Sequence, residues 1–222
     1  MEAYKELLLE SPLFHLLSEP ELTHILSCLD VRYKEYLQSQ IIIGESEESE
    51  EVGVVLDGEV IVYTIDMFGN RSITAKLGPK EVFGQVAASK IAAISPVSVE
   101  AKSDCTVLFL SFEKLVRPCS NACVFHSHVI KNMMHVLGER NLLISRKLLV
   151  LSQRTIREKL LAYLAWQKQQ HNSNEFVIDF TREELADYLS VNRSALSREI
   201  SSMVEEGLIT THRSHFTLLH VS

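Results

Sequence analysis

The chain has 222 residues, of which 46% are hydrophobic and 23% are charged, and its formal net charge is −7. This size fits one large domain or two small ones, and this composition excludes a wholly disordered chain. No run of about 18 uncharged apolar residues is present, so we expect no transmembrane helix and no membrane partner. The first residues carry Glu2, Glu6 and Glu10 where a secretory signal would carry basic residues, which predicts a cytoplasmic protein.

Acidic side chains are concentrated in the first two thirds of the chain. Residues 1–150 hold 14 Lys+Arg against 20 Asp+Glu, whereas residues 151–222 hold 8 against 9. Because the net charge does not favour nucleic acid, a contact with DNA would need a local basic face.

Two different sequence patterns precede the long helical segment. Residues 1–28 repeat leucines at helical spacing, with Ser18 as the expected N-cap. Residues 30–112 consist of short β-branched runs separated by six of the chain's eight glycines. Such short strands with frequent turn signals predict an antiparallel barrel, roll or sandwich, with hairpin tips at LDGEV (56–60) and MFGN (67–70).

One long helix is predicted over about residues 120–150, and two apolar stripes can be drawn on it. The first stripe contains His126, Ile130, Met133, Leu137, Asn141, Ile144, Leu148 and Leu151. The second contains Val129, Met133, Val136, Arg140, Leu143, Lys147 and Val150. One stripe can cover the β-region while the other suits a parallel partner helix; a single wide stripe in a monomer is the alternative. Met133 and Met134 are both predicted to lie in the helix core.

The last third of the chain is compact and mixed. Residues 154–170 predict an amphipathic helix, residues 176–180 a short strand, and residues 207–221 a strand, a polar turn and a strand. Between them, Thr181 and Glu184 have the spacing of a capping box, and Leu185 and Leu189 give the following helix an apolar face. A polar turn then leads to Asn192, which is expected to cap a second helix.

The second helix has two unlike faces. Leu196, Ile200 and Val204 are its predicted inner positions, and the outer face carries Arg193, Ser194, Ser197 and Arg198. This pattern is typical of a helix-turn-helix, whose second helix enters the major groove. Arginine matches the two acceptors of a guanine edge, and hydroxyls reach bases or phosphates. Two further residues complete the predicted DNA-binding set: Thr181 at the start of the first helix, and Arg213 in the polar turn within residues 207–221. The alternative is that the arginines of the outer face are simply exposed to solvent and bind nothing.

From about residue 10 to residue 221, the order of these motifs resembles the cyclic-AMP receptor / fumarate-nitrate reduction (CRP/FNR) family of bacterial transcription regulators. The resemblance is carried by LDGEVIVYTIDMFGNRSITAKLGPKEVFGQ, AKSDCTVLFLSFEKL and VNRSALSREI. It implies an α+β protein with a cyclic-nucleotide-binding-like antiparallel β-roll over residues 1–118, a dimerisation helix over 119–151 and a winged helix-turn-helix over 152–222. It also implies a homodimer on a palindromic operator in double-stranded DNA, contact with RNA polymerase, and base reading by Arg193, Ser197 and Arg198.

The chain departs from the family pattern at several positions. Gln85 stands where the family's nucleotide cassette has Glu, and Ser95–Val97 stand near the position of its phosphate-binding Arg. Because a buried phosphate without a cation is costly, we expect cyclic AMP not to bind, and we predict a different small effector. Ser194 replaces a frequent Glu, and Ser190 replaces the usual glycine of the turn. The predicted effector pocket comprises Phe83, Gly84, Gln85, Val86, Ser95, Val97, Met133, Arg140 and Asn141.

Two other sensing chemistries are alternatives to a small effector. An iron–sulfur cluster is not expected, since only Cys28 lies near the N-terminus. Cys119, Cys123 and His126 share a helix face and could ligate zinc or react with oxidants, although cysteines at a helix start are more often small apolar residues. The alternative function is therefore a ligand-free roll that binds DNA constitutively, or a metal or redox sensor at these residues. No motif predicts an enzyme, a catalytic residue or a resident metal.

Overall fold

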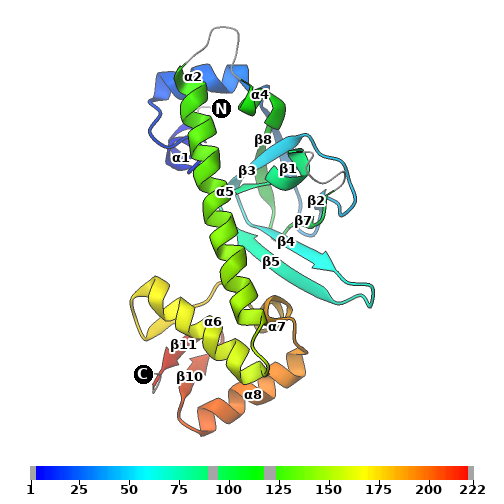
Figure 1. Ribbon diagram of the computed structural model, residues 1–222, viewed down its shortest axis with the longest axis vertical. Helices are drawn as coiled ribbons and strands as arrows, with labels where there is room; N and C mark the ends of the chain where they lie inside the picture. The colour runs from blue at the N-terminus through cyan, green and yellow to red at the C-terminus, as the bar shows by residue number, and fades with distance from the viewer. Residues whose placement is uncertain (1–3, 90–94, 118–123, 220–222) are drawn as a thin grey trace. The chain divides into compact units, whose positions relative to one another are not determined.

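The computed structural model describes residues 4–89, 95–117 and 124–219 (Figure 1). Contacts divide the chain into two compact units. Unit 1 consists of Met1–Thr64 with Ala75–Asn141, and unit 2 consists of Ile65–Thr74 with Leu142–Ser222. Among the described residues, no helix is both long and apolar enough to cross a bilayer.

Unit 1 begins with two short helices, α1 (Lys5–Glu10) and α2 (Glu19–Cys28). Ser18 caps α2 as predicted: its backbone N–H donates to a Glu21 carboxylate oxygen at 2.7 Å, which is half of a capping box. The helix therefore starts where the sequence places its cap.

Two four-stranded sheets follow, with strand orders β1-β8-β3-β6 and β2-β7-β4-β5. Antiparallel pairing joins β8 to β1 and β3, β3 to β6, and β7 to β2 and β4. The strands are β1 (Arg32–Tyr36), β2 (Ile41–Ile43), β3 (Glu51–Asp57), β4 (Val60–Ile65), β5 (Arg71–Leu77), β6 (Val82–Phe83), β7 (Ser98–Ala101) and β8 (Cys105–Ser111). Two short helices, α3 (Gln85–Ala88) and α4 (Phe112–Val116), accompany them. The predicted mixed fold with an antiparallel β-roll is confirmed.

The middle of β3 is buried on both faces because two cores share it. Val54 and Leu56 join a core formed with the N-terminal helices, whereas Val55 points into a second core between the sheets. Since successive side chains of a strand face opposite ways, a continuous apolar run is what a strand between two cores requires.

The β3–β4 turn requires a glycine. Gly58 has φ +77°, and a Cβ added there would lie 2.2 Å from the carbonyl oxygen of Asp104. A side chain at this position would therefore collide with the backbone of Asp104, and its residue would have to adopt an unfavourable backbone conformation. The turn lies where the sequence predicts it, but β3 and β4 belong to different sheets, so the prediction of a hairpin at LDGEV is wrong and this turn connects the two sheets. The other predicted tip, MFGN, does lie between neighbouring strands, β4 and β5.

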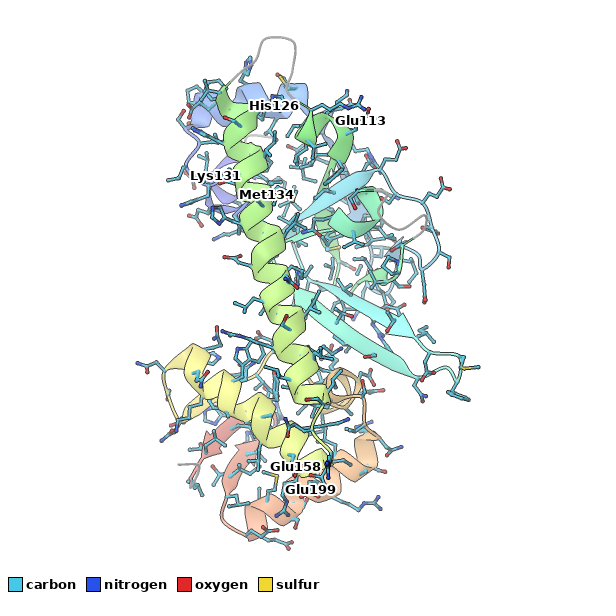
Figure 2. All side chains as sticks on the ribbon, in the orientation of Figure 1. Glu113, His126, Lys131, Met134, Glu158 and Glu199 are labelled. Atoms are coloured by element: carbon cyan, nitrogen blue, oxygen red, sulfur yellow. The ribbon has the colours of Figure 1, made fainter. Side chains whose placement is uncertain are left out.

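Unit 1 passes into unit 2 through α5 (Val124–Leu151), a continuous helix of 28 residues (Figure 1). Five residues of the second predicted stripe are buried: Val129, Met133, Val136, Lys147 and Val150. Most of the second stripe therefore packs inward, although Leu143 is exposed. Met134, labelled in Figure 2, is 65% exposed, so its predicted place in the core is wrong. It lies about 100° around the helix from buried Met133.

Unit 2 contains α6 (Ile156–His171), β9 (Glu175–Val177), α7 (Arg182–Leu189), α8 (Arg193–Glu205), β10 (Ile209–His212) and β11 (His215–Leu218). Its small sheet has the order β10-β11-β9, so the predicted strand–turn–strand is present. An aromatic cluster joins α6 to α7: the ring centres of Tyr163 and Tyr188 are 5.3 Å apart, and those of Phe180 and Tyr188 are 5.0 Å apart. Burial raises the pKa of Tyr188 to about 12.

Candidate nucleic-acid interface

Local capping fixes the geometry of the α7–turn–α8 segment. The backbone N–H groups of Thr181 and Glu184 bond to each other's side chains at 2.8 and 3.3 Å, as the capping box predicts. Ser190 ends α7 in the left-handed conformation, with φ 52°. Asn192 then accepts backbone N–H bonds from Ser194 and Ala195 at 2.9 and 3.4 Å, which starts α8 as predicted.

The inner face of α8 is formed by Leu196, Ile200 and Met203. Val204, predicted to be the third inner residue, is instead 40% exposed. The inner row advances by four and then by three residues, which follows the helical repeat of 3.6 better than two steps of four. The inner face of α8 therefore differs by one residue from the prediction.

The three residues predicted to read bases, Arg193, Ser197 and Arg198, all lie exposed on α8, as does Ser194 of the wider DNA-binding set. Arg193 is 66% exposed and its guanidinium is 3.8 Å from the carboxylate of Glu183, a weak pair in water. Within the described ranges Arg198 forms no ion pair or hydrogen bond. Neither arginine is tucked into the protein, so this face is free to contact a ligand.

Arg157 on α6 binds acidic side chains on and next to α8 and so holds this helix in place. The sequence did not predict this role. Its guanidinium donates to Glu199 at 2.6 Å and to both carboxylate oxygens of Glu206, at 2.6 and 2.8 Å (Figure 2, where Glu199 is labelled). These bonds raise the pKa of Arg157 above its ordinary value. They also occupy acidic groups of α8 that would otherwise add negative charge beside the arginine face.

Arg182 connects α7 to the β10–β11 turn and was likewise missed. Its guanidinium lies 5.1 Å from the ring centre of Phe216 and donates to the Arg213 carbonyl oxygen at 3.0 Å. Arg213 itself has φ 55° and an exposed side chain. Arg182 therefore fixes the turn that presents Arg213, while exposed Thr181 lies next to Arg182 at the start of α7.

Two family models match consecutive parts of the chain. The cyclic nucleotide-binding domain matches residues 33–121, and the Crp-like helix-turn-helix domain matches residues 158–222. The chain belongs to the CRP/FNR family of transcription regulators. Regulatory protein HlyX of Actinobacillus pleuropneumoniae is 24% identical over 208 residues, which cover 91% of this chain and 83% of HlyX.

Solved structures share the fold of this CRP/FNR chain. CLP of Xanthomonas campestris, described as a c-di-GMP responsive global regulator, has a TM-score of 0.74 at 14% identity, covering 92% of this chain and all of CLP's solved chain. A CooA variant from Carboxydothermus hydrogenoformans has a TM-score of 0.71 at 18% identity, covering 90% and 91% of the two chains. The winged helix-turn-helix of unit 2 lies in the residues that match the Crp-like helix-turn-helix domain.

The structure brings together two of the residues predicted for the effector pocket of this CRP/FNR protein. The side-chain amide of Gln85 and the guanidinium of Arg140 both donate to the Val82 carbonyl oxygen, each at 3.3 Å. Burial lowers the pKa of Arg140, against the charge of Glu81. A cation therefore stands beside the cassette, supplied by α5 and not by the cassette itself.

The other predicted pocket residues are more widely distributed. Phe83 lies in the core between the sheets with Gly84 next to it in the chain, whereas Met133 lies in the core with the N-terminal helices. The Ser95 hydroxyl donates to the Val97 carbonyl oxygen at 2.6 Å. Val86 and Asn141 are exposed.

The metal or redox hypothesis involves residues that are only partly described. Cys119 and Cys123 lie outside the described residues. His126 is buried, and its Nε2 is 3.2 Å from the Lys114 carbonyl oxygen, so it ties α5 to α4. In the part of the chain that the structure covers, no three His, Cys, Asp or Glu residues are grouped to hold a metal. Cys105 is buried in β8, and burial raises the pKa of its thiol.

Proposed function

We propose that this regulator binds double-stranded DNA in a sequence-specific manner by placing α8 in the major groove. The observation that carries the proposal is the exposed face of Arg193, Ser194, Ser197 and Arg198 on a helix that Arg157 holds from behind. Arg198 makes no bond to its own chain in the described residues, so its five donors remain available for a guanine edge or a phosphate. Thr181 and Arg213 flank this face as phosphate contacts.

Binding-site selection from random duplexes tests this proposal. We expect one enriched palindrome, and Arg198→Ala should weaken binding to it by roughly 1–3 kcal/mol and relax one base position per half-site. Arg117→Ala is the matched control, because Arg117 is an exposed arginine of unit 1, paired with Glu113. If no sequence is enriched, or if both variants bind the selected site as tightly as the wild type, the base-reading assignment is wrong.

We propose further that the protein acts as a homodimer through residues 119–151. Met134, Leu142, Leu148 and Leu149 are large apolar side chains of α5 that are 54–67% exposed within one chain. Such a face on one long helix suits the same helix of a second copy, because two identical stripes bury each other around a two-fold axis. A two-fold dimer would in turn match a palindromic operator.

We propose that the effector is a small molecule other than cyclic AMP. We also propose that the DNA-bound protein contacts RNA polymerase, as the family resemblance implies. Gln85 replaces a carboxylate and the cassette lacks its own cation, while Arg140 offers a cation from a different direction. Thermal unfolding with cyclic AMP tests the first part: a ligand at a hundred times its Kd stabilises by about 2.7 kcal/mol. We expect no such stabilisation, and observing one would refute this interpretation of the cassette. DNA affinity that no ligand changes would favour a constitutive binder.

A further inference from the structure

The turn end of the β4–β5 hairpin belongs to unit 2, although the other ends of both strands belong to unit 1. Residues Ile65–Thr74 pack with the last part of α5 and with the helix-turn-helix. Asp66 stiffens the tip by accepting the backbone N–H bonds of Phe68 and Asn70, at 2.8 and 2.9 Å. The tip of this hairpin is therefore part of the same unit as the helix-turn-helix.

Lys147 of α5 lies at the centre of this contact. Its ammonium donates to the Ile73 carbonyl oxygen at 2.5 Å and to the Ser72 hydroxyl at 3.3 Å. It also lies 5.1 Å from the ring centre of Tyr188 on α7. One side chain of the long helix thus contacts both the hairpin and the first helix of the helix-turn-helix.

The hairpin also reaches the helix-turn-helix directly. The Ser72 and Ser190 hydroxyl oxygens are 3.2 Å apart, and Ser190 is the left-handed residue that ends α7. Beside them, the charge of Arg71 counteracts the rise that burial causes in the pKa of Asp187 on α7. The contact therefore falls on the turn that sets the direction of α8.

Lys147 is held only by neutral partners. It is 9% exposed and forms no ion pair with a carboxylate in the described part of the chain. A buried ammonium without a counter-charge loses hydration that a carbonyl, a hydroxyl and a ring only partly replace. The closed arrangement is thus weakly favoured, so that a small change in the hairpin can open it.

We propose that Ser72, Lys147 and Ser190 form a latch, and that the roll controls DNA binding by holding this latch closed or open. When the latch is closed, the helix-turn-helix is fixed to the end of α5. In a dimer, the two α5 helices then set the separation of the two α8 helices. When it is open, the helix-turn-helix loses its attachment to the hairpin and keeps the chain that links α5 to α6 and the contact of Arg146 with Trp166, whose ring centre is 5.9 Å from the guanidinium. This inference rests on the proposed dimeric DNA binding.

The test compares binding to one half-site with binding to palindromes lengthened or shortened by about one to three base pairs. We expect the wild type to prefer one spacing by about fivefold or more. Ser190→Gly and Lys147→Met should reduce this preference and leave half-site affinity unchanged. Ser190→Gly removes the hydroxyl without opposing the left-handed backbone, so that variant is expected to fold. Lys147→Met keeps the length of the side chain.

Lys159→Met is the matched control. Lys159 donates to the Leu189 carbonyl oxygen at 3.4 Å, but from α6, which lies after the α5–α6 link. It should keep the wild-type spacing preference. Ser72→Ala should reduce the spacing preference at least as much as Ser190→Gly, because it removes both the contact with Ser190 and the hydrogen bond from Lys147.

The outcomes separate the latch from the proposed function. If the wild type prefers one spacing and Ser190→Gly and Lys147→Met prefer it equally strongly, the latch is refuted. Equal loss of half-site and palindrome affinity would also refute it, since that is the result of simple destabilisation. If the wild type binds no duplex at all, the proposed function fails before the latch is tested.

Discussion

At the residue scale, Arg213 is predicted to contribute charge without reading sequence. Its exposed side chain extends from a turn whose backbone is held by Arg182. Arg213→Asn removes the charge and suits the positive φ. We expect it to weaken binding equally for the selected operator and for random duplex, and to reduce the slope of log affinity against log salt by about 1. Fluorescence anisotropy at several salt concentrations measures both, with Arg213→Lys as the control. A loss confined to one base position would show that Arg213 reads a base.

Also at the residue scale, Lys147 gives stability an unusual pH dependence. Burial lowers the pKa of its ammonium to about 8. Between this value and the ordinary one, the unfolded chain binds more protons than the folded chain, so the free energy of unfolding rises with pH. Between about pH 7 and about pH 9.5, we expect the free energy of unfolding of the wild type to rise by roughly 2 kcal/mol relative to that of Lys147→Met.

Denaturant unfolding of both proteins across this pH range measures the gain. Tyr188 faces the ammonium from α7, and its pKa of about 12 keeps it neutral throughout. Arg71 and Asp187 lie on the neighbouring elements and are present in both proteins. A pH-independent difference between the two proteins would mean that the ammonium of Lys147 is not desolvated.

At the scale of the element, the start of α8 depends on one side chain. Asn192 accepts two backbone N–H bonds at the first turn. Asn192→Ala should reduce the free energy of unfolding by about 1 kcal/mol, whereas Asn192→Ser should retain most of it. Thermal unfolding compares the two variants. If alanine and serine are equally destabilising, the cap does not set where α8 begins.

Local rules account for most of the elements but for few of the contacts between them. Caps such as Asn192 and the Thr181–Glu184 box are readable because both partners lie within one turn. Arg157 was missed because its partner Glu206 lies 49 residues away, and Lys147 was placed in a stripe without its partner Ile73, 74 residues away. No spacing in the sequence indicates such pairs, since they depend on how the elements pack.

At the scale of the whole molecule, the exposed side of α5 predicts the oligomeric state. Gly138 lies on this side, and a Cβ added there would meet nothing within 4 Å in one chain. Gly138→Ala should therefore stabilise the helix of a single chain by about 1 kcal/mol. If the second copy packs closely at Gly138, the same methyl group should weaken the dimer. Thermal unfolding and the dimer dissociation constant measure the two effects separately. A variant with unchanged dimer affinity would place the interface elsewhere on the helix.

Leu149→Glu tests the dimer itself, with Leu37→Glu as the control. The two leucines are 66% and 64% exposed in one chain, but only Leu149 lies on α5. Exposed substitutions typically change stability by no more than about 0.5 kcal/mol, so both variants should fold. Sedimentation velocity should find the wild type and Leu37→Glu at twice the chain mass and Leu149→Glu at the chain mass. On DNA, Leu149→Glu should keep half-site binding and lose its advantage on the palindrome, because the second half-site is no longer bound within the same complex. A wild type that sediments as a single chain, or a dimer that survives Leu149→Glu, would contradict the α5 interface.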